Sequence, residues 1–137
     1  MARVETRPLV LVAACVLLDG GQLLITRRPA GKPLAGLWEF PGGKVEPNEA
    51  PEAALVRELR EELAIEIAPD DLAPFTFASH DYPDFHLLMP VYLCQSWRGA
   101  VTPLEGQEVC WVKPDELVAY DMPPADEPLK TALRALL

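Results

Sequence analysis

Three glutamates recur at the spacing of a single helical face in the segment from Glu49 to Leu63. With about 100° of rotation per residue, Glu58, Glu61 and Glu62 fall on one side of a predicted helix. Apolar residues occupy the other side, as is typical of a helix packed on a core. The apolar residues expected there are Ala53, Val56, Leu59 and Leu63. The segment therefore predicts an amphipathic helix whose polar face carries a carboxylate cluster.

This carboxylate cluster has two interpretations. Many charged helix faces are simply solvated, although like charges three or four residues apart destabilise a helix by about 0.2–0.5 kcal/mol per pair. The alternative is a hard divalent cation held between the carboxylates. Mg²⁺ takes oxygen ligands, keeps several waters and is usually completed by substrate phosphates. The spacing favours a Mg²⁺ site, with Mn²⁺ as the second candidate.

Two adjacent glycines precede the helix, in the stretch Pro41-Gly42-Gly43-Lys44. Glycine tolerates positive φ, so the backbone can turn sharply there and approach a ligand closely. A stretch of this kind is most often a plain turn. Directly ahead of an acidic helix, it predicts a loop that cradles metal and phosphate, with a backbone carbonyl free to bind the metal.

Strands and helices are mixed along the chain, and together they must position these residues. The predicted strands span residues 10–18, 22–27, 38–40, 72–79, 85–97 and 109–112. The predicted helices span residues 49–63, 114–120 and 126–136, with Asn48 as the N-cap of the first and Pro51 in its first turn. We expect Phe75, Phe77, Tyr92 and Trp111 in the core. The mixture indicates an α/β or α+β fold with a sheet packed between helices.

Length and charge narrow the function classes. A chain of 137 residues predicts one domain over residues 1–137. The 12 basic and 21 acidic residues leave a net charge of −9, which disfavours duplex nucleic acid or an anionic membrane as a partner. An anionic substrate would need metal or the local basic group of Arg27, Arg28, Lys32 and Lys44.

Three cysteines without a C-x-x-C pair predict reduced thiols and a cytoplasmic protein. Monomer and dimer both remain open.

The acidic helix and the stretch before it together resemble the Nudix box of hydrolases that cleave nucleoside diphosphates linked to another group. The matching positions are Gly43, Glu49, Arg57, Glu58, Leu59, Glu61, Glu62 and Ile65. Ala64 stands where the family has glycine, so we expect the helix exit to differ but not the activity. The segments 25–28, 38–44, 105–107 and 123–128 resemble, in the same order, the MutT branch, which removes oxidised guanine nucleotides. The resemblance implies the Nudix α/β/α sandwich, with a mixed sheet between helices.

The resemblance also implies roles for individual residues. Mg²⁺ would be held by Glu58, Glu61, Glu62, the Gly42 carbonyl and Glu105. Arg57 would orient the glutamates, and Glu58 or Glu62 would serve as the base for an attacking water. Arg28 would meet phosphate or base, although a surface cation at a strand end is the alternative. The implied substrate contacts are Arg28, Glu39, Phe40, Pro41, Gly42 and Asp126. The implied products are a nucleoside monophosphate and pyrophosphate.

Asp126 bears on the identity of the nucleotide. The MutT pattern has asparagine there, whose amide offers one donor and one acceptor to oxidised guanine. An ionised aspartate only accepts and favours an amine such as cytosine N4, whereas burial could raise its pKa until it donates. Asp126 could also serve only as a helix N-cap. Three hypotheses follow: an 8-oxo-dGTP diphosphatase, a Nudix hydrolase of CTP, dCTP or another modified nucleotide, and a catalytically silent nucleotide-binding module.

Overall fold

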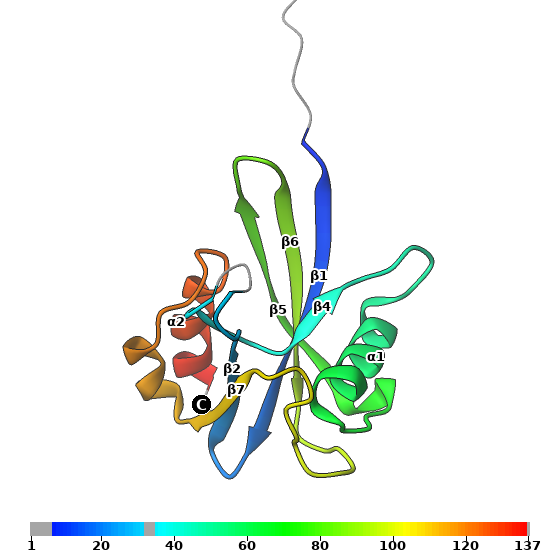
Figure 1. Cartoon of the computed structure of the whole chain (residues 1–137), viewed down its shortest axis with the longest axis vertical. Helices are drawn as coiled ribbons and strands as arrows, with labels where there is room; N and C mark the ends of the chain where they lie inside the picture. Colours follow the sequence, from blue (N-terminus) through cyan, green and yellow to red (C-terminus); the bar gives the residue numbers. More distant parts are fainter. Residues whose placement is uncertain (1–6, 32–34, 137) are drawn as a thin grey trace, which may run out of the picture.

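Seven strands form one mixed sheet in the computed structural model, which describes residues 7–31 and 35–136 (Figure 1). The strands are β1 (Leu9–Asp19), β2 (Gln22–Arg27), β3 (Trp38–Glu39), β4 (Gly42–Lys44), β5 (Leu72–Asp81), β6 (His86–Cys94) and β7 (Glu108–Val112). The helices are α1 (Pro51–Leu63) and α2 (Glu127–Leu136), with 3₁₀ turns at Pro69–Asp71 and Pro114–Ala119. The strand order is β3-β2-β1-β6-β5, while β4 pairs with β1 and β7 with β2.

The central strand β1 is buried on both faces. Its side chains alternate, so that Ala14 and Val16 belong to one buried cluster and Cys15 and Leu17 to the other. This two-sided burial explains why its sequence reads as a continuous apolar run. β1 runs parallel to β6 and antiparallel to β2 and β4, which makes the sheet mixed.

The two helices cover opposite faces of the sheet (Figure 1). Leu55, Leu59 and Leu63 of α1 pack in the cluster that holds Leu17, while two leucines of α2 pack in the cluster that holds Val16. The structure therefore confirms the α/β sandwich with a mixed sheet between helices. No helix in the described part of the chain is long and apolar enough to cross a membrane.

The glycine-rich stretch differs from its prediction. It was expected to be a loop, but Gly42–Lys44 forms β4 and pairs with β1, with Gly42 opposite Ala14. Gly42 has a φ of 151°, and a Cβ there would lie 2.0 Å from the Ala13 carbonyl oxygen. Glycine is thus required because two backbones approach each other closely.

The start of α1 also differs from its prediction. Asn48 is not the N-cap: the helix begins at Pro51, and its N-cap is Ala50, which makes no side-chain capping bond. Asn48 instead lies in the preceding turn with a φ of 64°, a conformation that asparagine tolerates. Pro51 is in the first turn as expected, and Glu49 lies before the first residue of the helix.

Other corrections follow from where the elements end. β6 stops at Cys94, so Trp97 is outside it, and the short helix over 114–120 is a 3₁₀ turn. Ala53 is exposed, while Ala54 next to it is buried. Phe77 was expected in the core, yet its side chain is 65% exposed because it lies on the edge strand β5.

Candidate active site

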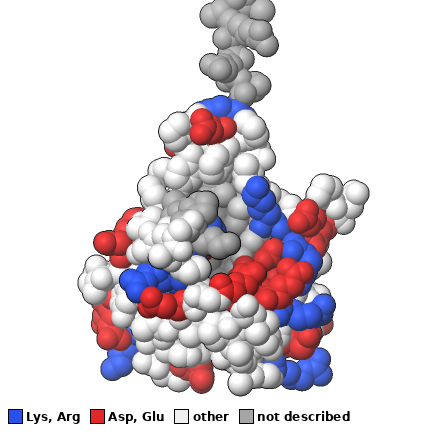
Figure 2. Space-filling view, in the orientation of Figure 1, with Lys and Arg blue, Asp and Glu red and all other residues white. Residues whose placement is uncertain are grey.

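A cavity of about 260 Å³ opens between the end of α1, the segment from β3 to β4 and the loop that leads into β7. Its lining residues are Thr26, Arg28, Pro29, Glu39, Gly42, Glu62, Glu105 and Gln107. Figure 2 shows a hollow on this face with acidic side chains gathered along one side of it, over α1. The cavity therefore brings together acidic residues from the helix and from a distant loop.

Arg57 ties the turn before α1 to the carboxylates on the helix. Its Nε and Nη2 donate to the two carboxylate oxygens of Glu49 at 3.0 and 2.9 Å, and its Nη1 donates to Glu58 Oε1 at 2.8 Å. Nη2 also donates to the Lys44 carbonyl at 3.1 Å. The hydrogen bond from Arg57 is the main cause that lowers the pKa of Glu49 to about 2. The planar guanidinium thus holds Glu58 in a fixed orientation, as the predicted role requires.

Glu58 lies directly against the glycine-rich strand. A Cβ on Gly43 would lie between 2.5 and 2.7 Å from the carboxylate atoms of Glu58. Any larger residue at Gly43 would therefore displace this carboxylate. The two glycines serve different purposes: Gly42 allows β4 to approach β1, and Gly43 makes room for Glu58.

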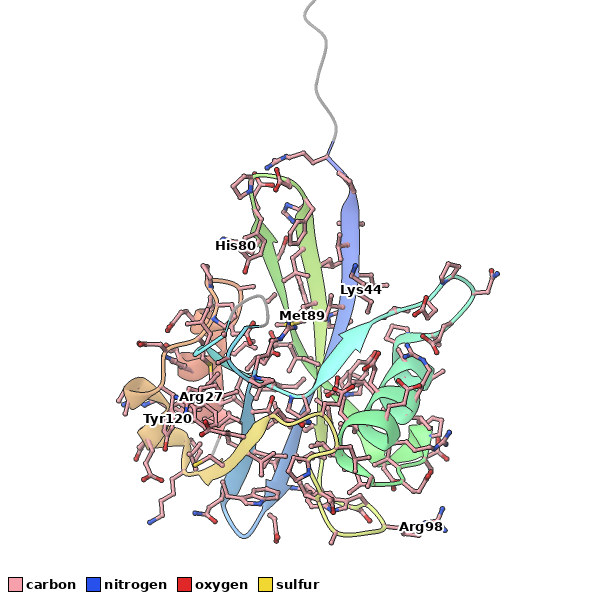
Figure 3. The ribbon with its side chains drawn as sticks, viewed as in Figure 1. Arg27, Lys44, His80, Met89, Arg98 and Tyr120 are labelled. Carbon is pink, nitrogen blue, oxygen red and sulfur yellow. The ribbon has the colours of Figure 1, made fainter. Side chains whose placement is uncertain are left out.

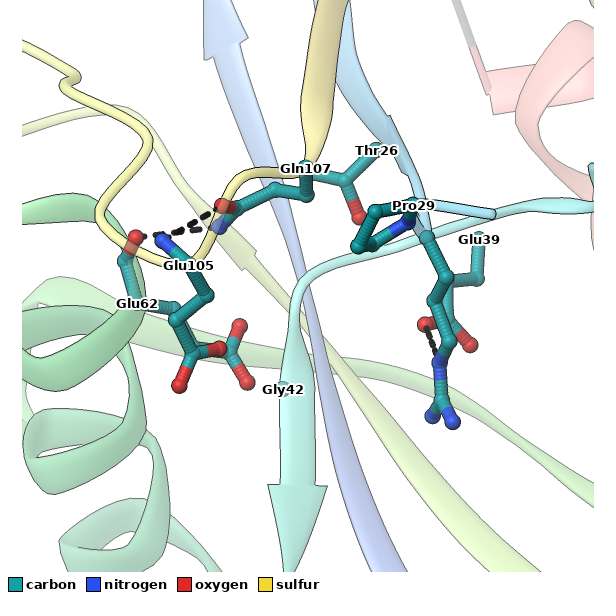
Figure 4. A pocket seen from close by; sticks show the side chains of 8 residues that line it. Thr26, Pro29, Glu39, Gly42, Glu62, Glu105 and Gln107 are labelled. Atoms are coloured by element: carbon teal, nitrogen blue, oxygen red, sulfur yellow. Dashed lines mark hydrogen bonds and ion pairs between the residues drawn. The ribbon is translucent and has the colours of Figure 1, made fainter. Parts of the chain in front are cut away.

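Glu62 is the most strongly perturbed carboxyl group of the cluster. Burial raises its pKa to about 9, and a hydrogen bond with Glu58 and the charges of Glu58, Glu105 and Glu39 act in the same direction. Figure 4 shows the carboxylates of Glu62 and Glu105 pointing toward the same part of the cavity. Such a group of hard oxygen donors is short of positive charge, and a divalent cation fits that need.

Of the remaining predicted ligands, Glu61 does not line the cavity: its side chain is 57% exposed, and its Oε2 lies 3.7 Å from Arg57 Nη1. Gly42 and Glu105 both line the cavity. No three acidic, histidine or cysteine side chains within residues 7–31 and 35–136 form a ready-made metal cage. Mg²⁺ does not need one, because it keeps several waters and is completed by substrate phosphates.

Arg28 lines the other side of the cavity. Its Nε donates to Glu39 Oε1 at 2.9 Å, and Glu39 also lines the cavity. The predicted basic group is not assembled as one: Arg27 pairs with Glu108 and lies over the Trp38 ring, whereas Lys44 lies apart from it on β4 (Figure 3). Lys32 lies outside the described residues.

Asp126 is buried at the start of α2, with 6% of its surface exposed. Its carboxyl group accepts a hydrogen bond from the Phe40 backbone N–H, which connects it to the segment that follows β3. Burial raises the pKa of Asp126 to about 7, and the charges of Glu39 and Glu127 act in the same direction. At neutral pH the group is therefore poised between donor and acceptor.

Phe40 and Pro41 lie in the chain between Glu39 and Gly42, two residues that line the cavity. Phe40 is 5% exposed and belongs to the core on the α2 side of the sheet. The Pro41 carbonyl accepts a hydrogen bond from the Cys15 N–H at 2.9 Å, so it anchors the segment to β1. Neither residue lines the cavity. Their packing and hydrogen bonding instead position the neighbouring residues Glu39 and Gly42, which do line it.

Sequence reasoning missed several residues of the site. Thr26, Pro29 and Gln107 line the cavity. Thr26 and Gln107 had a signal, since they lie in the segments 25–28 and 105–107 that resemble the MutT branch, whereas Pro29 had none. The Tyr82 hydroxyl accepts a hydrogen bond from the Ala125 N–H at 3.3 Å, next to Asp126, and no local pattern indicated that contact.

Comparison with known proteins agrees with this geometry. A family model described as "NUDIX domain" matches residues 13–132. The 8-oxo-dGTP diphosphatase of Escherichia coli K12 is 39% identical over 118 aligned residues, covering 86% of this chain and 90% of that protein. The CTP pyrophosphohydrolase of the same strain is 38% identical over 142 aligned positions, covering 93% of each.

Solved structures point in the same direction. The solution structure of the E. coli ORF135 protein superposes with a TM-score of 0.84 at 34% identity, covering 98% of this chain and 95% of that one. A MutT structure from an analysis of the Aliivibrio salmonicida and Vibrio cholerae proteins superposes with a TM-score of 0.79 at 34% identity, covering 94% and 99%. Fold and site thus define a hydrolase of phosphoric anhydride bonds. The chain belongs to the Nudix family, and within it to the nucleotide pyrophosphohydrolases.

Proposed function

We propose that this protein is a Mg²⁺-dependent 8-oxo-dGTP diphosphatase, which hydrolyses 8-oxo-dGTP to 8-oxo-dGMP and pyrophosphate and so removes a mutagenic precursor. The observation that carries the choice of base is the buried Asp126 carboxyl, whose pKa is about 7. In its protonated form it offers one donor and one acceptor, the pair that oxidised guanine requires. The E. coli relative named 8-oxo-dGTP diphosphatase supports the same substrate.

The metal would be held at the acidic end of the cavity. Glu58, Glu62 and Glu105 supply carboxylate oxygens there, and Glu61 and the Gly42 carbonyl complete the proposed set. Nudix hydrolases generally need a divalent metal. A bound divalent cation would neutralise phosphate oxygens and stabilise the departing pyrophosphate. Mn²⁺ has the same preference for oxygen ligands and could replace Mg²⁺.

The side chains of this chain supply the remaining steps. Glu58, or Glu62 in the ionised form that a bound divalent cation would favour, accepts the proton of the attacking water, while the water oxygen bonds to phosphorus and the anhydride P–O bond breaks. Arg57 keeps Glu58 aimed at this point through its hydrogen bond. Arg28, held by Glu39, meets the phosphates or the base at the mouth of the cavity.

A second candidate substrate is CTP or dCTP. Above its pKa, Asp126 only accepts hydrogen bonds and would bind the N4 amine of cytosine. A relative named CTP pyrophosphohydrolase is nearly as similar to this chain as the 8-oxo-dGTP diphosphatase. The two candidates require opposite protonation states of the Asp126 carboxyl.

The test is the initial rate of hydrolysis with Mg²⁺ at pH 7, followed as pyrophosphate release for 8-oxo-dGTP, dGTP, CTP, dCTP and 2-hydroxy-dATP and as AMP formation for ADP-ribose. We expect kcat/KM for 8-oxo-dGTP to exceed the others at least tenfold, about 1.4 kcal/mol of discrimination. A preference for CTP or dCTP would replace the proposed substrate with the second candidate. Absence of turnover over the whole panel would reject both.

A further inference from the structure

One side-chain amide joins the loop that carries Glu105 to the helix that carries Glu62. The Gln107 Nε2 donates to the Glu62 backbone carbonyl at 3.0 Å. Its Oε1 accepts from the Glu105 backbone N–H at 2.8 Å. Figure 4 shows both bonds beside the cavity. A single side chain thus connects the backbones of two cavity-lining carboxylate residues.

This connection lies at the C-terminal end of α1, where backbone carbonyl groups need hydrogen-bond donors from outside the helix. The last carbonyl groups of a helix have no hydrogen-bond donors within it. In α1 these partners come from the loop: Thr102 N–H donates to the Leu63 carbonyl at 2.9 Å, and Leu104 N–H donates to the Glu62 carbonyl at 3.0 Å. The loop is therefore fastened to the end of the helix just before Glu105.

Gln107 extends this fastening to Glu105 itself. Gly106, between the two, has a φ of 73°, a left-handed conformation that glycine adopts without strain and that turns the chain back. The Glu105 N–H finds its partner in the Gln107 side chain. An amide side chain carries both a donor and an acceptor, so Gln107 can donate to the helix and accept from the loop at once.

We propose that Gln107 is a positioning residue, which holds the Glu105 carboxylate beside Glu62 so that both reach one divalent cation. This inference rests on the cation site of the proposed function. The groups that orient metal ligands matter nearly as much as the ligands, and their loss costs roughly 10–100-fold in metal affinity or activity. Gln107 acts through Glu105 and need not touch the substrate.

The test uses Gln107→Met, which keeps the length of the side chain and removes both hydrogen bonds. The matched control is Gln95→Met, the same change at an exposed position of the loop that joins β6 to β7. In the metal-free protein, hydrogen exchange of the Glu105 amide should speed up about tenfold in Gln107→Met only. Mn²⁺ binding, followed by the electron paramagnetic resonance signal of free Mn²⁺, should weaken about tenfold, at the lower end of that range.

A double variant distinguishes positioning from general damage. If Gln107 acts through Glu105, Glu105→Gln with Gln107→Met should bind Mn²⁺ no more weakly than Glu105→Gln alone. Additive losses would overturn the proposal, as would faster Glu105 exchange with unchanged Mn²⁺ binding. Failure of the wild-type protein to bind Mn²⁺ would reject the cation site of the proposed function. In that case, the exchange rates would still report whether Gln107 holds the loop.

Discussion

At the α1 end of the site several carboxylates gather around one arginine, whereas at the α2 end a single carboxyl group, that of Asp126, is buried. The α1 end contains both extremes of ionisation: Arg57 lowers the pKa of Glu49 to about 2, and burial raises that of Glu62 to about 9. Asp126 lies between them at about 7. One type of functional group is thus tuned to three different states by its surroundings.

The two ends also differ in how they are assembled. One helix and the strand before it supply most of the acidic end, so neighbours in sequence are neighbours in space. The Asp126 end joins the segment after β3, the turn before α2 and the tip of the β5–β6 hairpin, through Phe40, Ala125 and Tyr82. On the proposed function, the metal chemistry depends mostly on one contiguous stretch of chain, whereas base selectivity depends on contacts between distant segments. The following predictions test this contrast.

The largest effect is expected at Glu62, the partly buried carboxyl that lines the cavity at the acidic end. Glu62→Gln keeps the shape but removes the charge and the ability to accept a proton, so kcat with Mg²⁺ should fall by about 10³-fold. Steady-state pyrophosphate release measures it. Glu66→Gln, at an exposed glutamate paired with Arg60, should leave kcat unchanged. Wild-type kcat in Glu62→Gln would remove this residue from the metal site.

A smaller effect is expected at Arg57, which orients carboxylates without replacing them. Arg57→Lys keeps the charge but cannot reach Glu49 and Glu58 together, because an ammonium lacks the planar fork. We expect kcat to fall by about 10–100-fold, as for other residues that orient metal ligands. The matched variant Arg60→Lys, whose arginine pairs with the exposed Glu66, should behave as wild type. Equal activity of both variants would contradict the positioning role.

At the α2 end the expected effect is on selectivity. Below its pKa of about 7 Asp126 is protonated and can donate to oxidised guanine, while above it the group is ionised and only accepts. The ratio of kcat/KM for 8-oxo-dGTP to that for CTP should therefore fall about tenfold from pH 6 to pH 8, about 1.4 kcal/mol. Glu39 and Glu127 are the charged groups that set this pKa, and groups that act on both substrates, such as Glu62, cancel in the ratio.

Asp126→Asn is the variant that tests this titration. It should make the ratio independent of pH and hold it at or above the wild-type value at pH 6, because an amide keeps both donor and acceptor. Asp121→Asn, an exposed aspartate in the same segment, should keep the wild-type pH profile. A pH-dependent ratio in Asp126→Asn would show that another group governs selectivity. Loss of 8-oxo-dGTP turnover would contradict the assigned base contact.

The smallest effect is expected at the exit of α1, away from both ends. Ala64 has a φ of 59° and a ψ of 29°, the left-handed conformation that costs an L-residue about 1–2 kcal/mol. Ala64→Gly should therefore raise the free energy of unfolding by about 1 kcal/mol without changing kcat. Ala53→Gly, at an exposed position within the same helix, should lower it by about as much. Denaturant unfolding measures both, and the same sign for both would refute the interpretation.

The residue that departs from the Nudix pattern also corrects an expectation. We expected Ala64 to alter the helix exit, but it takes the backbone conformation that glycine would take. Its N–H donates to the Arg60 carbonyl at 3.2 Å, and the next N–H donates to the Leu59 carbonyl at 3.5 Å. Contacts of the loop that follows hold this turn in place. Alanine at position 64, where the family has glycine, therefore adds backbone strain but does not change the conformation of the turn.

Sequence alone determined the features that depend on neighbours along the chain. The 3.6-residue repeat placed the glutamates on one face of α1, and the strand predicted over residues 10–18 is β1. The Nudix resemblance predicted that Arg57 orients them, and Arg57 does donate a hydrogen bond to Glu58. All of these follow from spacing within a few turns or one strand, where backbone geometry leaves little choice.

Tertiary structure decided what depends on segments far apart in the chain. Gly42–Lys44 becomes a strand because it pairs with β1. Asn48 does not cap α1, and the neighbouring Glu49 accepts a hydrogen bond from Arg57. Asp126 acquires its pKa from burial beside Phe40, and the Gln107 side chain joins the backbones of Glu105 and Glu62. Burial and contacts between distant segments arise only when the sheet and both helices assemble, so no local pattern could reveal them.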